Sequence, residues 1–434
     1  MAAAQGLEEV HQEVTAWLKE HWDAELTVGQ WWQLMADSGW GFPTWPTEYW
    51  GRGLGSDALS VVSQAFQEVG ALGAPGGLGQ MMGGPVVIQH GNEDQRQRLV
   101  SKLANGTEGW CQFFSEPGSG SDLASAQTRA VRDGDEWIVN GQKVWTSGAM
   151  TADRGMLLAR VDMDAPKHKG LGYFIIEVDQ PGIEVRPLKQ MTGHSMFNEV
   201  FFTDARVAHA DLIGRPGDGW AAAVTTLAYE RGGRAGAVGV GMGLGRAGGA
   251  RRAALDEKVG DLVAAARASR AEADPRQPTP GTTPIELAKE YGRDQDPVAR
   301  QDVMRYTILT RISALNQQRT RAEAAKGKSP GPASSITKLY RSNVTRLNRD
   351  LGPRLLGASG MLAGERAPHG GAVTQATLQA PSSSIAGGTD EVQHNIMGER
   401  VLGLPREPDV DRDLPFRELK VGTQRSLTRP KEDT

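Results

Sequence analysis

The feature of this sequence that most restricts its fold is a double change in hydrophobic spacing along the chain. Near the start, Leu7, Val10, Val14 and Leu18 recur at intervals of three and four, which predicts one face of a helix. Strand-like runs then replace this spacing in LGYFIIEV (171–178) and EVFFTDARV (199–207), and helical spacing returns after Gly217. The order predicts an α+β protein with a helical domain (1–111), a β domain (112–208) and a helical domain (209–434).

Local signals place further elements within these domains. The Trp- and Pro-rich stretch 39–53 predicts an ordered loop, and residues 57–70 and 92–105 predict helices. In EWIVNGQKVWTSG (136–148), Asn140-Gly141 favours a type I′ hairpin turn between two strands. The Pro-rich stretch 271–284 predicts a surface linker.

Two apolar stripes in the last third predict long amphipathic helices, joined by a Lys/Gly/Pro-rich loop, in a helix bundle. Their residues are Met304, Ile308, Ile312 and Leu315 in the first, and Ile336, Tyr340, Val344, Leu347, Leu351 and Leu355 in the second.

Charge and cysteine content exclude several classes of protein. The 48 basic and 52 acidic residues nearly cancel, so no basic surface for nucleic acid is expected. Cys111 is the single cysteine, which suits a reducing compartment. The N-terminus shows no signal-peptide pattern, and no apolar run approaches the roughly 18 residues of a membrane span. These observations predict a cytoplasmic protein with no membrane or nucleic-acid partner.

Several short motifs match known sites only in part. GLGRAG (243–248) fits G-x-G-x-x-G, but helical and Pro-rich sequence follows instead of a second strand. The nine glycines from 232 to 249 favour close helix packing or a tolerant, flexible helix. Gly327-Lys328-Ser329 lacks the first glycine of a phosphate loop, no G-x-S-x-G is present, and the eight histidines show no metal-ligand spacing. No metal is expected.

Two other motifs point to a flavin. SEPGSGSD (115–122) supplies glycine N–H groups and hydroxyl donors, and KVWTSG (143–148) places a flat aromatic beside two hydroxyls. Together they resemble the T-E-P-x-x-G-S-D and G-x-K-x-W-I-T segments of the acyl-CoA dehydrogenase family. Further matches follow in order through HGNEDQRQRLV (90–100), FNEVFFTDARV (197–207), GRPGDGW (214–220) and GGTDEVQHNIMGERVLGLPRE (387–407).

The resemblance implies an N-terminal helical domain, a central β-barrel-like domain and a C-terminal four-helix bundle. It also implies FAD held between subunits, and α,β-dehydrogenation of an acyl-CoA to the trans-2-enoyl-CoA with hydride transfer to flavin N5. By motif position, it implies cofactor contacts from Ser115, Trp145, Thr146, Ser147, Thr389 and Glu391. Ser121 is expected beside the pantetheine or phosphate of the substrate. An electron-transfer flavoprotein is the expected electron acceptor, and a homodimer or homotetramer the expected assembly.

The catalytic base is the main departure from the usual pattern. Many members read Y-E-G-T with glutamate as base, whereas this chain reads Ala386-Gly387-Gly388-Thr389. Gly387 keeps the backbone N–H that binds the thioester oxygen, and Gly388 is expected to contact substrate. A second family pattern places the base before an arginine on a helix, which here assigns Glu230, with Arg231 supporting CoA. Asp390 and Glu391 are lesser candidates, expected to face cofactor or solvent.

Other departures leave alternatives open. The family's R-x-x-F-G segment appears as EYGRDQDPVARQ (290–301), and its Q-x-x-G-G-x-G as RLLGASG (354–360), so Arg293, Arg300 or Arg354 is expected to supply positive charge to the pyrophosphate. These departures resemble family members that act on bulky substrates such as sterol side chains, and the glycines at 232–249 suggest a wide acyl pocket. The expected substrate is a bulky, branched, cyclic or long acyl group. A hetero-oligomer in which this chain is a non-catalytic subunit, and an oxidase of the nitroalkane type, are the alternatives.

Overall fold

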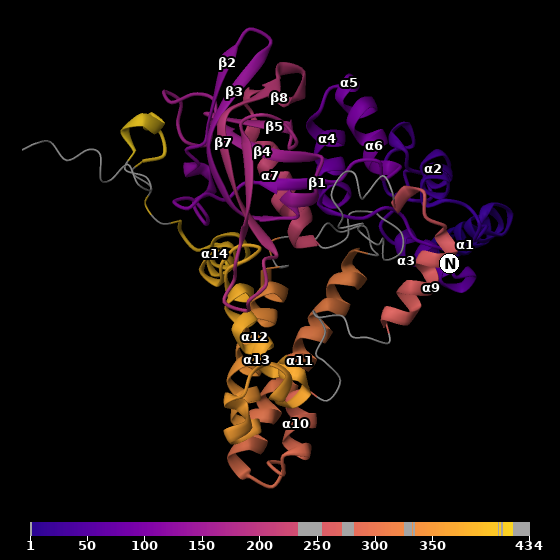
Figure 1. Cartoon of the computed structure of the whole chain (residues 1–434), viewed down its shortest axis with the longest axis vertical. Helices are drawn as coiled ribbons and strands as arrows, with labels where there is room; N and C mark the ends of the chain where they lie inside the picture. The colour runs from indigo at the N-terminus through magenta and orange to yellow at the C-terminus, as the bar shows by residue number, and fades with distance from the viewer. Residues whose placement is uncertain are drawn as a thin grey trace, which may run out of the picture. The chain divides into compact units, whose positions relative to one another are not determined.

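The computed structural model describes residues 2–232, 254–270, 282–324, 332, 335–406, 408 and 411–419. Contacts divide the chain into two compact units, drawn in Figure 1. Unit 1 comprises Met1–Lys189, Ser195–Val263 and Pro408–Thr434, and unit 2 comprises Gln190–His194 and Ala264–Glu407. The motifs 243–248 and 327–329, and most of the stretch 271–284, lie outside the described residues.

Unit 1 begins with helices that share one tryptophan-rich core. They are α1 (Ala2–His21), α2 (Val28–Ser38), α3 (Ala58–Val69), α4 (Gly84–His90), α5 (Glu93–Gln95) and α6 (Ser101–Ala104). The predicted stripe of α1 is confirmed, since Val14 and Leu18 are fully buried. Trp40 and Trp45 are buried in the 39–53 segment, which confirms an ordered loop there. The helices α2 and α4 were not predicted from the sequence.

An eight-stranded sheet follows, with the order β6-β7-β3-β2-β4-β5-β8. Its strands are β1 (Trp110–Phe113), β2 (Arg129–Asp133), β3 (Glu136–Ser147), β4 (Arg154–Arg160), β5 (Leu171–Glu177), β6 (Ile183–Leu188), β7 (Phe197–Ala208) and β8 (Leu212–Gly217). Strands β1 and β2 pair in parallel with successive parts of β4, so β1 extends the sheet beside the start of β4. The strands predicted at 171–178 and 199–207 are confirmed.

The predicted hairpin turn at Asn140-Gly141 is wrong, because β3 runs through it without a break. Gly141 has φ 152°, and a Cβ there would lie 2.5 Å from Thr128 Oγ1, so the position needs glycine for space. The pairing of β3 with β7 shifts at this point, which marks a bulge. The hairpin turn lies earlier, where Asp133 pairs with Glu136 and Gly134 has φ 60°.

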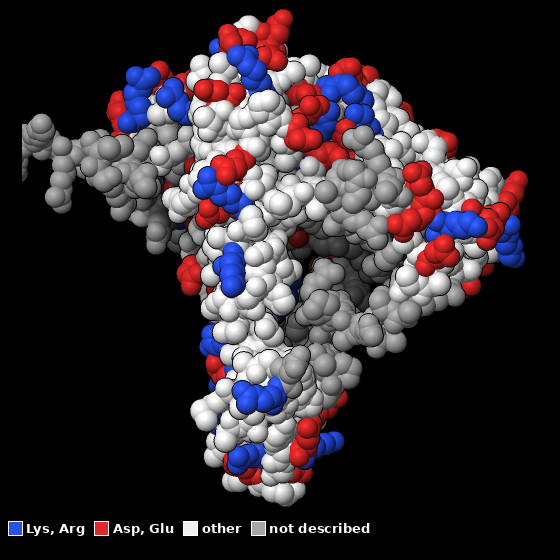
Figure 2. All heavy atoms as spheres, in the orientation of Figure 1, with Lys and Arg blue, Asp and Glu red and all other residues white. Residues whose placement is uncertain are grey.

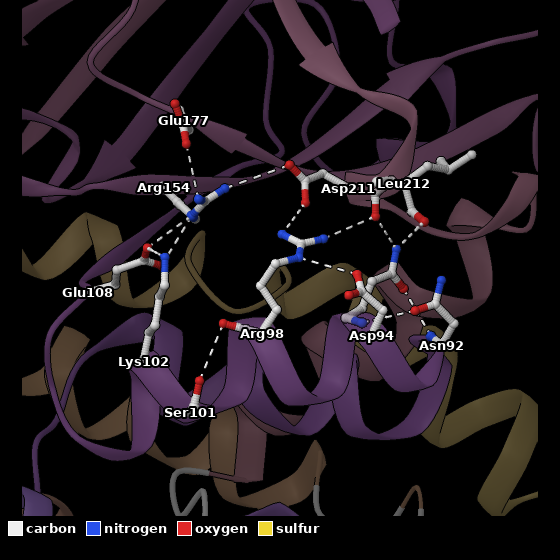
Figure 3. A network of polar contacts seen from close by, with 12 residues as sticks. Asn92, Asp94, Arg98, Ser101, Lys102, Glu108, Arg154, Glu177, Asp211 and Leu212 are labelled. Carbon is white, nitrogen blue, oxygen red and sulfur yellow. Dashed lines mark hydrogen bonds and ion pairs between the residues drawn. The ribbon is translucent and has the colours of Figure 1, made fainter. Parts of the chain in front are cut away.

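A polar network joins the helices of unit 1 to the sheet (Figure 3). Arg154, at the start of β4, contacts Glu108 at 3.1 Å and Asp211 at 3.7 Å. Arg98, in the π-helical turn Arg96–Val100, donates to the same Asp211 at 2.7 Å.

The helix α7 (Gly219–Gly232) packs against β5, where the hydroxyls of its Thr226 and of Tyr173 lie 3.0 Å apart. These contacts fix α7 on the sheet.

Unit 2 is a helical bundle. The helices that follow α7 are α9 (Val259–Arg270), which crosses the boundary between the units, α10 (Pro284–Glu290), α11 (Pro297–Ala324), α12 (Ser335–Leu356), α13 (Ala372–Gln379) and α14 (Asp390–Ile396). The two predicted long helices are confirmed as α11 and α12. Leu351 and Leu355 are buried, but Met304, Ile308 and Leu315 on α11 are about half exposed. The described residues of this chain therefore leave much of the α11 stripe uncovered.

The described surface carries charges of both signs. On the face that Figure 2 draws, Lys and Arg side chains alternate with Asp and Glu rather than gathering into one patch. Among the described helices, none combines the length and apolar character that crossing a bilayer requires.

Candidate active site

A buried ion pair ties the loop that begins at Ser115 to strand β3. Lys143 Nζ donates to Glu116 Oε1 at 2.8 Å and to the carbonyl of Phe114 at 2.9 Å. The backbone N–H of Val144 donates to the carbonyl of Ser115 at 2.9 Å. These contacts bring the two glycine- and hydroxyl-rich motifs side by side within unit 1.

Glu116 also organises the backbone of its own loop. Its carboxylate accepts hydrogen bonds from the N–H groups of Gln127 at 2.7 Å and Thr128 at 2.9 Å. Burial raises the pKa of Glu116, but the charge and hydrogen bond of Lys143 and these donors outweigh it, so the pKa lies below its usual value. An ionised Glu116 therefore closes the loop from 116 to 128.

Trp145 projects from the sheet at the end of β3. Its φ of 62° is left-handed, and the register with β7 shifts between Lys143 and Thr146, so the residue sits in a bulge. Its side chain is 58% exposed although its ring contacts Phe197 edge-on at 5.9 Å. A bulge re-aims a side chain at the cost of local strain. The arrangement presents one large aromatic ring for stacking.

Thr146 and Ser147 follow in the same strand. Thr146 is 1% exposed, and in the part of the chain that the structure describes its Oγ1 is buried without a hydrogen-bond partner. Its carbonyl accepts from Asn198 Nδ2 at 3.0 Å, and Ser147 is half-buried opposite Phe197. A buried hydroxyl without a partner is uncommon and marks a place where a polar ligand can bind. Ser121, by contrast, is exposed on its turn.

Glu230 lies in the last turn of α7 and is half-buried. Tyr229 beside it is 37% exposed, and Val224 on the same helix is 45% exposed, so α7 offers apolar surface along part of its length. The side chain of Arg231 and the glycine-rich stretch after Gly232 lie outside what the structure describes.

In unit 2, two glycines form a turn before α14. Gly387 has φ 70° and Gly388 has φ 86°, conformations that favour glycine. A Cβ on Gly387 would meet nothing within 4 Å, whereas one on Gly388 would lie 2.6 Å from Gln393 Nε2. The buried Gln393 donates to the carbonyl of Gly387 at 3.1 Å. This bond holds the peptide that follows Gly387, the residue whose own N–H the resemblance assigns to the thioester oxygen.

The residues at the start of α14 have different environments. Thr389 is the N-cap and accepts from the N–H of Val392 at 3.2 Å, and Glu391 is exposed. Asp390 is 4% exposed and pairs with Lys338 at 2.8 Å and Arg346 at 2.5 Å. The expectation that Asp390 faces cofactor or solvent is therefore wrong.

The electrostatics of Asp390 also make it unsuitable as a base. Burial raises its pKa, but hydrogen bonds from Lys338, Ser342 and Arg346 outweigh this and lower the pKa to about 2. A carboxylate with such a low pKa binds a proton weakly, and its oxygens already accept hydrogen bonds from Lys338 and Arg346. Its role is to fix α14 on α12.

The segments expected to hold the pyrophosphate meet in unit 2. Arg354 is exposed and donates to Asp302 at 2.9 Å. Gly357 has φ 60°, and Arg293 Nη2 lies 3.1 Å from the place of a Cβ there. Arg300 donates to the carbonyl of Asp294 at 2.9 Å. The structure thus brings Arg293 beside the 354–360 turn.

Models of three consecutive domains match this chain. They are described as acyl-CoA dehydrogenase, N-terminal domain (residues 3–107), middle domain (111–205) and C-terminal domain (287–402). Acyl-CoA dehydrogenase IpdE1 of Mycobacterium tuberculosis is 32% identical over 423 residues, which covers 93% of this chain and 99% of the relative. The chain belongs to the acyl-CoA dehydrogenase family.

Further relatives and solved structures agree with this assignment. Acyl-CoA dehydrogenase FadE34 of Mycobacterium tuberculosis is 36% identical over 375 residues, covering 86% of this chain and 46% of the relative. The Tcur3481-Tcur3483 steroid ACAD is 26% identical with a TM-score of 0.63, covering 93% of this chain and 98% of that chain. The predicted three-part α+β architecture is confirmed.

As a member of the family, this acyl-CoA dehydrogenase is an FAD-dependent oxidoreductase acting on CH–CH groups. Residues in unit 1 fit that cofactor. The exposed, strained Trp145 offers a stacking face, and the unpartnered Thr146 Oγ1 offers a polar contact beside it.

Three residues in the candidate segments of the two units were not given a role from the sequence. Glu116 and Lys143 stand inside the recognised motifs, and a buried pair of opposite charges is the signal that links them. Gln393 is fully buried in α14, yet nothing in its sequence surroundings distinguishes it from a surface glutamine. Its role emerges only once the glycine turn folds back over α14.

Proposed function

We propose that this acyl-CoA dehydrogenase removes the α-proton of an acyl-CoA thioester with Glu230 as the base. The supporting observation is that the 386–390 segment offers no suitable base. Gly387 has no carboxylate, and Asp390 is ion-paired with a lowered pKa. Glu230 is half-buried at the end of a helix fixed on the sheet. A partly desolvated carboxylate near apolar surface is a stronger base than an exposed one.

Other residues would bind and orient the reactants. The N–H of Gly387 would donate to the thioester oxygen as negative charge develops there, with Gly388 beside the substrate. The proposed contacts of the CoA portion are Ser121 and Arg231. The residues proposed to bind FAD are Ser115, Trp145, Thr146, Ser147, Thr389, Glu391 and Arg354. FAD, when bound, accepts the β-hydride. An electron-transfer flavoprotein is the proposed final acceptor, and the cytoplasm the proposed location.

The proposed substrate is a bulky, branched or cyclic acyl group, including a steroid side chain. A 26% identical solved relative carries the name steroid ACAD, which supports this class. The alternatives within the family are long straight chains. Comparing the rate of flavin bleaching by steroid-side-chain and straight-chain acyl-CoAs separates the two classes.

Replacing Glu230 tests the assignment of the base. Glu230→Gln should leave the purified protein yellow while lowering kcat with an artificial acceptor by roughly 100-fold or more, the usual share of a general base. The matched control is Glu9→Gln, an exposed glutamate on α1, which should keep full activity. Full activity in the Glu230 variant would reject the assignment.

A second candidate is a non-catalytic subunit that completes the FAD site of a paralogous partner. The name of the similar Tcur3481-Tcur3483 steroid ACAD joins two proteins, which supports this candidate. It predicts a colourless protein when this chain is purified alone, and yellow protein after co-expression with the partner. A yellow homo-oligomer that turns over an acyl-CoA would exclude it.

A further inference from the structure

The described C-terminal segment 411–419 lies against the β domain of unit 1. The N–H groups of Phe416 and Arg417 each donate at 3.0 Å, to the carbonyls of Ala165 and Met163. The family's C-terminal domain model ends at residue 402, so this segment lies beyond the part of the chain that the family model describes. Its contacts therefore call for an explanation of their own.

Phe416 anchors this segment. Its side chain is fully buried, and the guanidinium carbon of Arg160 lies 3.7 Å from its ring centroid. Arg160, at the end of β4, is itself 1% exposed. A cation over an aromatic face is attracted most strongly when both groups are desolvated, as here.

The hydrogen bonds of Arg160 go to main-chain carbonyls. Nη2 donates to Ala124 at 2.5 Å and to Ala126 at 3.3 Å, and Nη1 donates to Lys167 at 2.6 Å. Ala124 and Ala126 lie just after the turn at residues 119–122, which contains Ser121. Lys167 reaches the same turn, because its Nζ lies 3.1 Å from Asp122 Oδ1.

A chain of contacts thus runs from the C-terminal segment to the turn. Burial lowers the pKa of Arg160 to about 10, although the charges of Glu116, Asp122 and Asp162 oppose this shift. Without the ring, water can reach the guanidinium and compete for its donors. The carbonyls of Ala124 and Ala126 would then lose their fixed partner.

We propose that Phe416 is a positioning residue for the substrate. By holding Arg160 against the carbonyls of Ala124 and Ala126, it fixes the 119–122 turn in the form that binds the phosphate-bearing CoA portion. The inference rests on the proposed function, in which Ser121 contacts that portion. The turn suits such a ligand because Ser121 is exposed and a Cβ on Gly120 would meet nothing within 4 Å.

The test compares two variants of Phe416 on two thioesters of one acyl group. Phe416→Leu removes the aromatic face and should raise KM for the acyl-CoA about ten-fold with kcat nearly unchanged. Phe416→Tyr keeps the face and should restore most of the affinity. The acyl-N-acetylcysteamine thioester lacks the nucleotide and phosphates, so its kcat/KM should be the same in all forms. Arg417→Ala, which removes only an exposed ion pair with Asp164, is the matched control.

Amide hydrogen exchange provides a readout that does not require turnover. In Phe416→Leu, exchange over residues 119–126 should become faster, whereas Arg417→Ala should leave it unchanged. Equal losses on both thioesters, a fall in kcat alone, or unchanged exchange in Phe416→Leu would overturn the inference. If the wild-type protein oxidises no acyl-CoA, the proposed function fails, while the exchange experiment still decides whether Phe416 orders the turn.

Discussion

At the scale of single residues, contacts with distant parts of the chain set the conformation of Trp145 and the ionisation of Asp390. Trp145 and Thr146 stand in a recognisable motif, yet the left-handed φ of Trp145 depends on a bulge set by pairing with β7. Asp390 and Glu391 are adjacent and acidic, but only Asp390 is buried against Lys338. Such differences come from tertiary packing, which residue type and spacing do not encode.

The glycine at 387 offers a sharp test of the base assignment. In the Glu230→Gln background, Gly387→Glu should raise activity about ten-fold or more, because a carboxylate returns to the position used by other family members. The open space around Gly387 admits a side chain, although its φ of 70° costs about 1 kcal/mol for a non-glycine residue. The matched control, Gly387→Gln in the same background, carries the same strain without a base and should stay inactive. Equal activities in an acceptor assay would contradict the assignment.

At the scale of elements, strongly periodic segments could be predicted and bulged or short ones could not. The helices α1, α11 and α12 follow from their apolar spacing. The strand β3 was divided wrongly at Gly141, because an Asn-Gly pair within a strand signals a turn locally while a bulge depends on close contact with Thr128. The helix α4 is buried on most sides, so no amphipathic pattern distinguishes it.

The junction between helices and sheet should weaken in acid. Burial raises the pKa of Glu108, but Arg154, Lys102 and Trp110 outweigh it, so the folded pKa lies below the unfolded value. This carboxylate therefore stabilises the fold above the unfolded pKa, and the contribution is lost as pH falls through the folded one. Glu108→Gln should cost about 3 kcal/mol at pH 7, as expected for breaking a buried pair, and progressively less as pH falls from the usual carboxylate pKa through the lower folded pKa.

A matched variant isolates the effect of burial at this junction. Glu177 contacts the same Arg154 at 3.0 Å, but its side chain is 63% exposed. Glu177→Gln should therefore cost less than about 1 kcal/mol at any pH. Thermal unfolding of both variants between pH 3.5 and 7 checks this, and equal shifts in Tm would show that burial does not control the interaction.

At the scale of the whole molecule, the α–β–α order was predictable because the hydrophobic spacing changes from helical to strand-like and back along the chain. The sequence could not predict which apolar helix faces stay exposed in a single chain. Periodicity shows that a helix has an apolar face, but not what covers that face. The stripe of α11 illustrates this limit. Met304 and Ile308 are each 52% exposed, and Leu315 is 51% exposed.

We expect a second copy of this chain to cover the α11 stripe, because exposed apolar stripes on a helix are typical of interfaces. Met304→Glu with Ile308→Glu should place two charges in that interface and convert the oligomer largely to smaller species in light-scattering chromatography. Gln301→Glu with Gln318→Glu adds the same charge to exposed polar positions of α11 and should leave the oligomer intact. If both double variants keep the wild-type mass, the stripe is not the homomeric interface. If Met304→Glu with Ile308→Glu instead prevents only the assembly with a co-expressed paralogue, the α11 stripe is the interface of a hetero-oligomer.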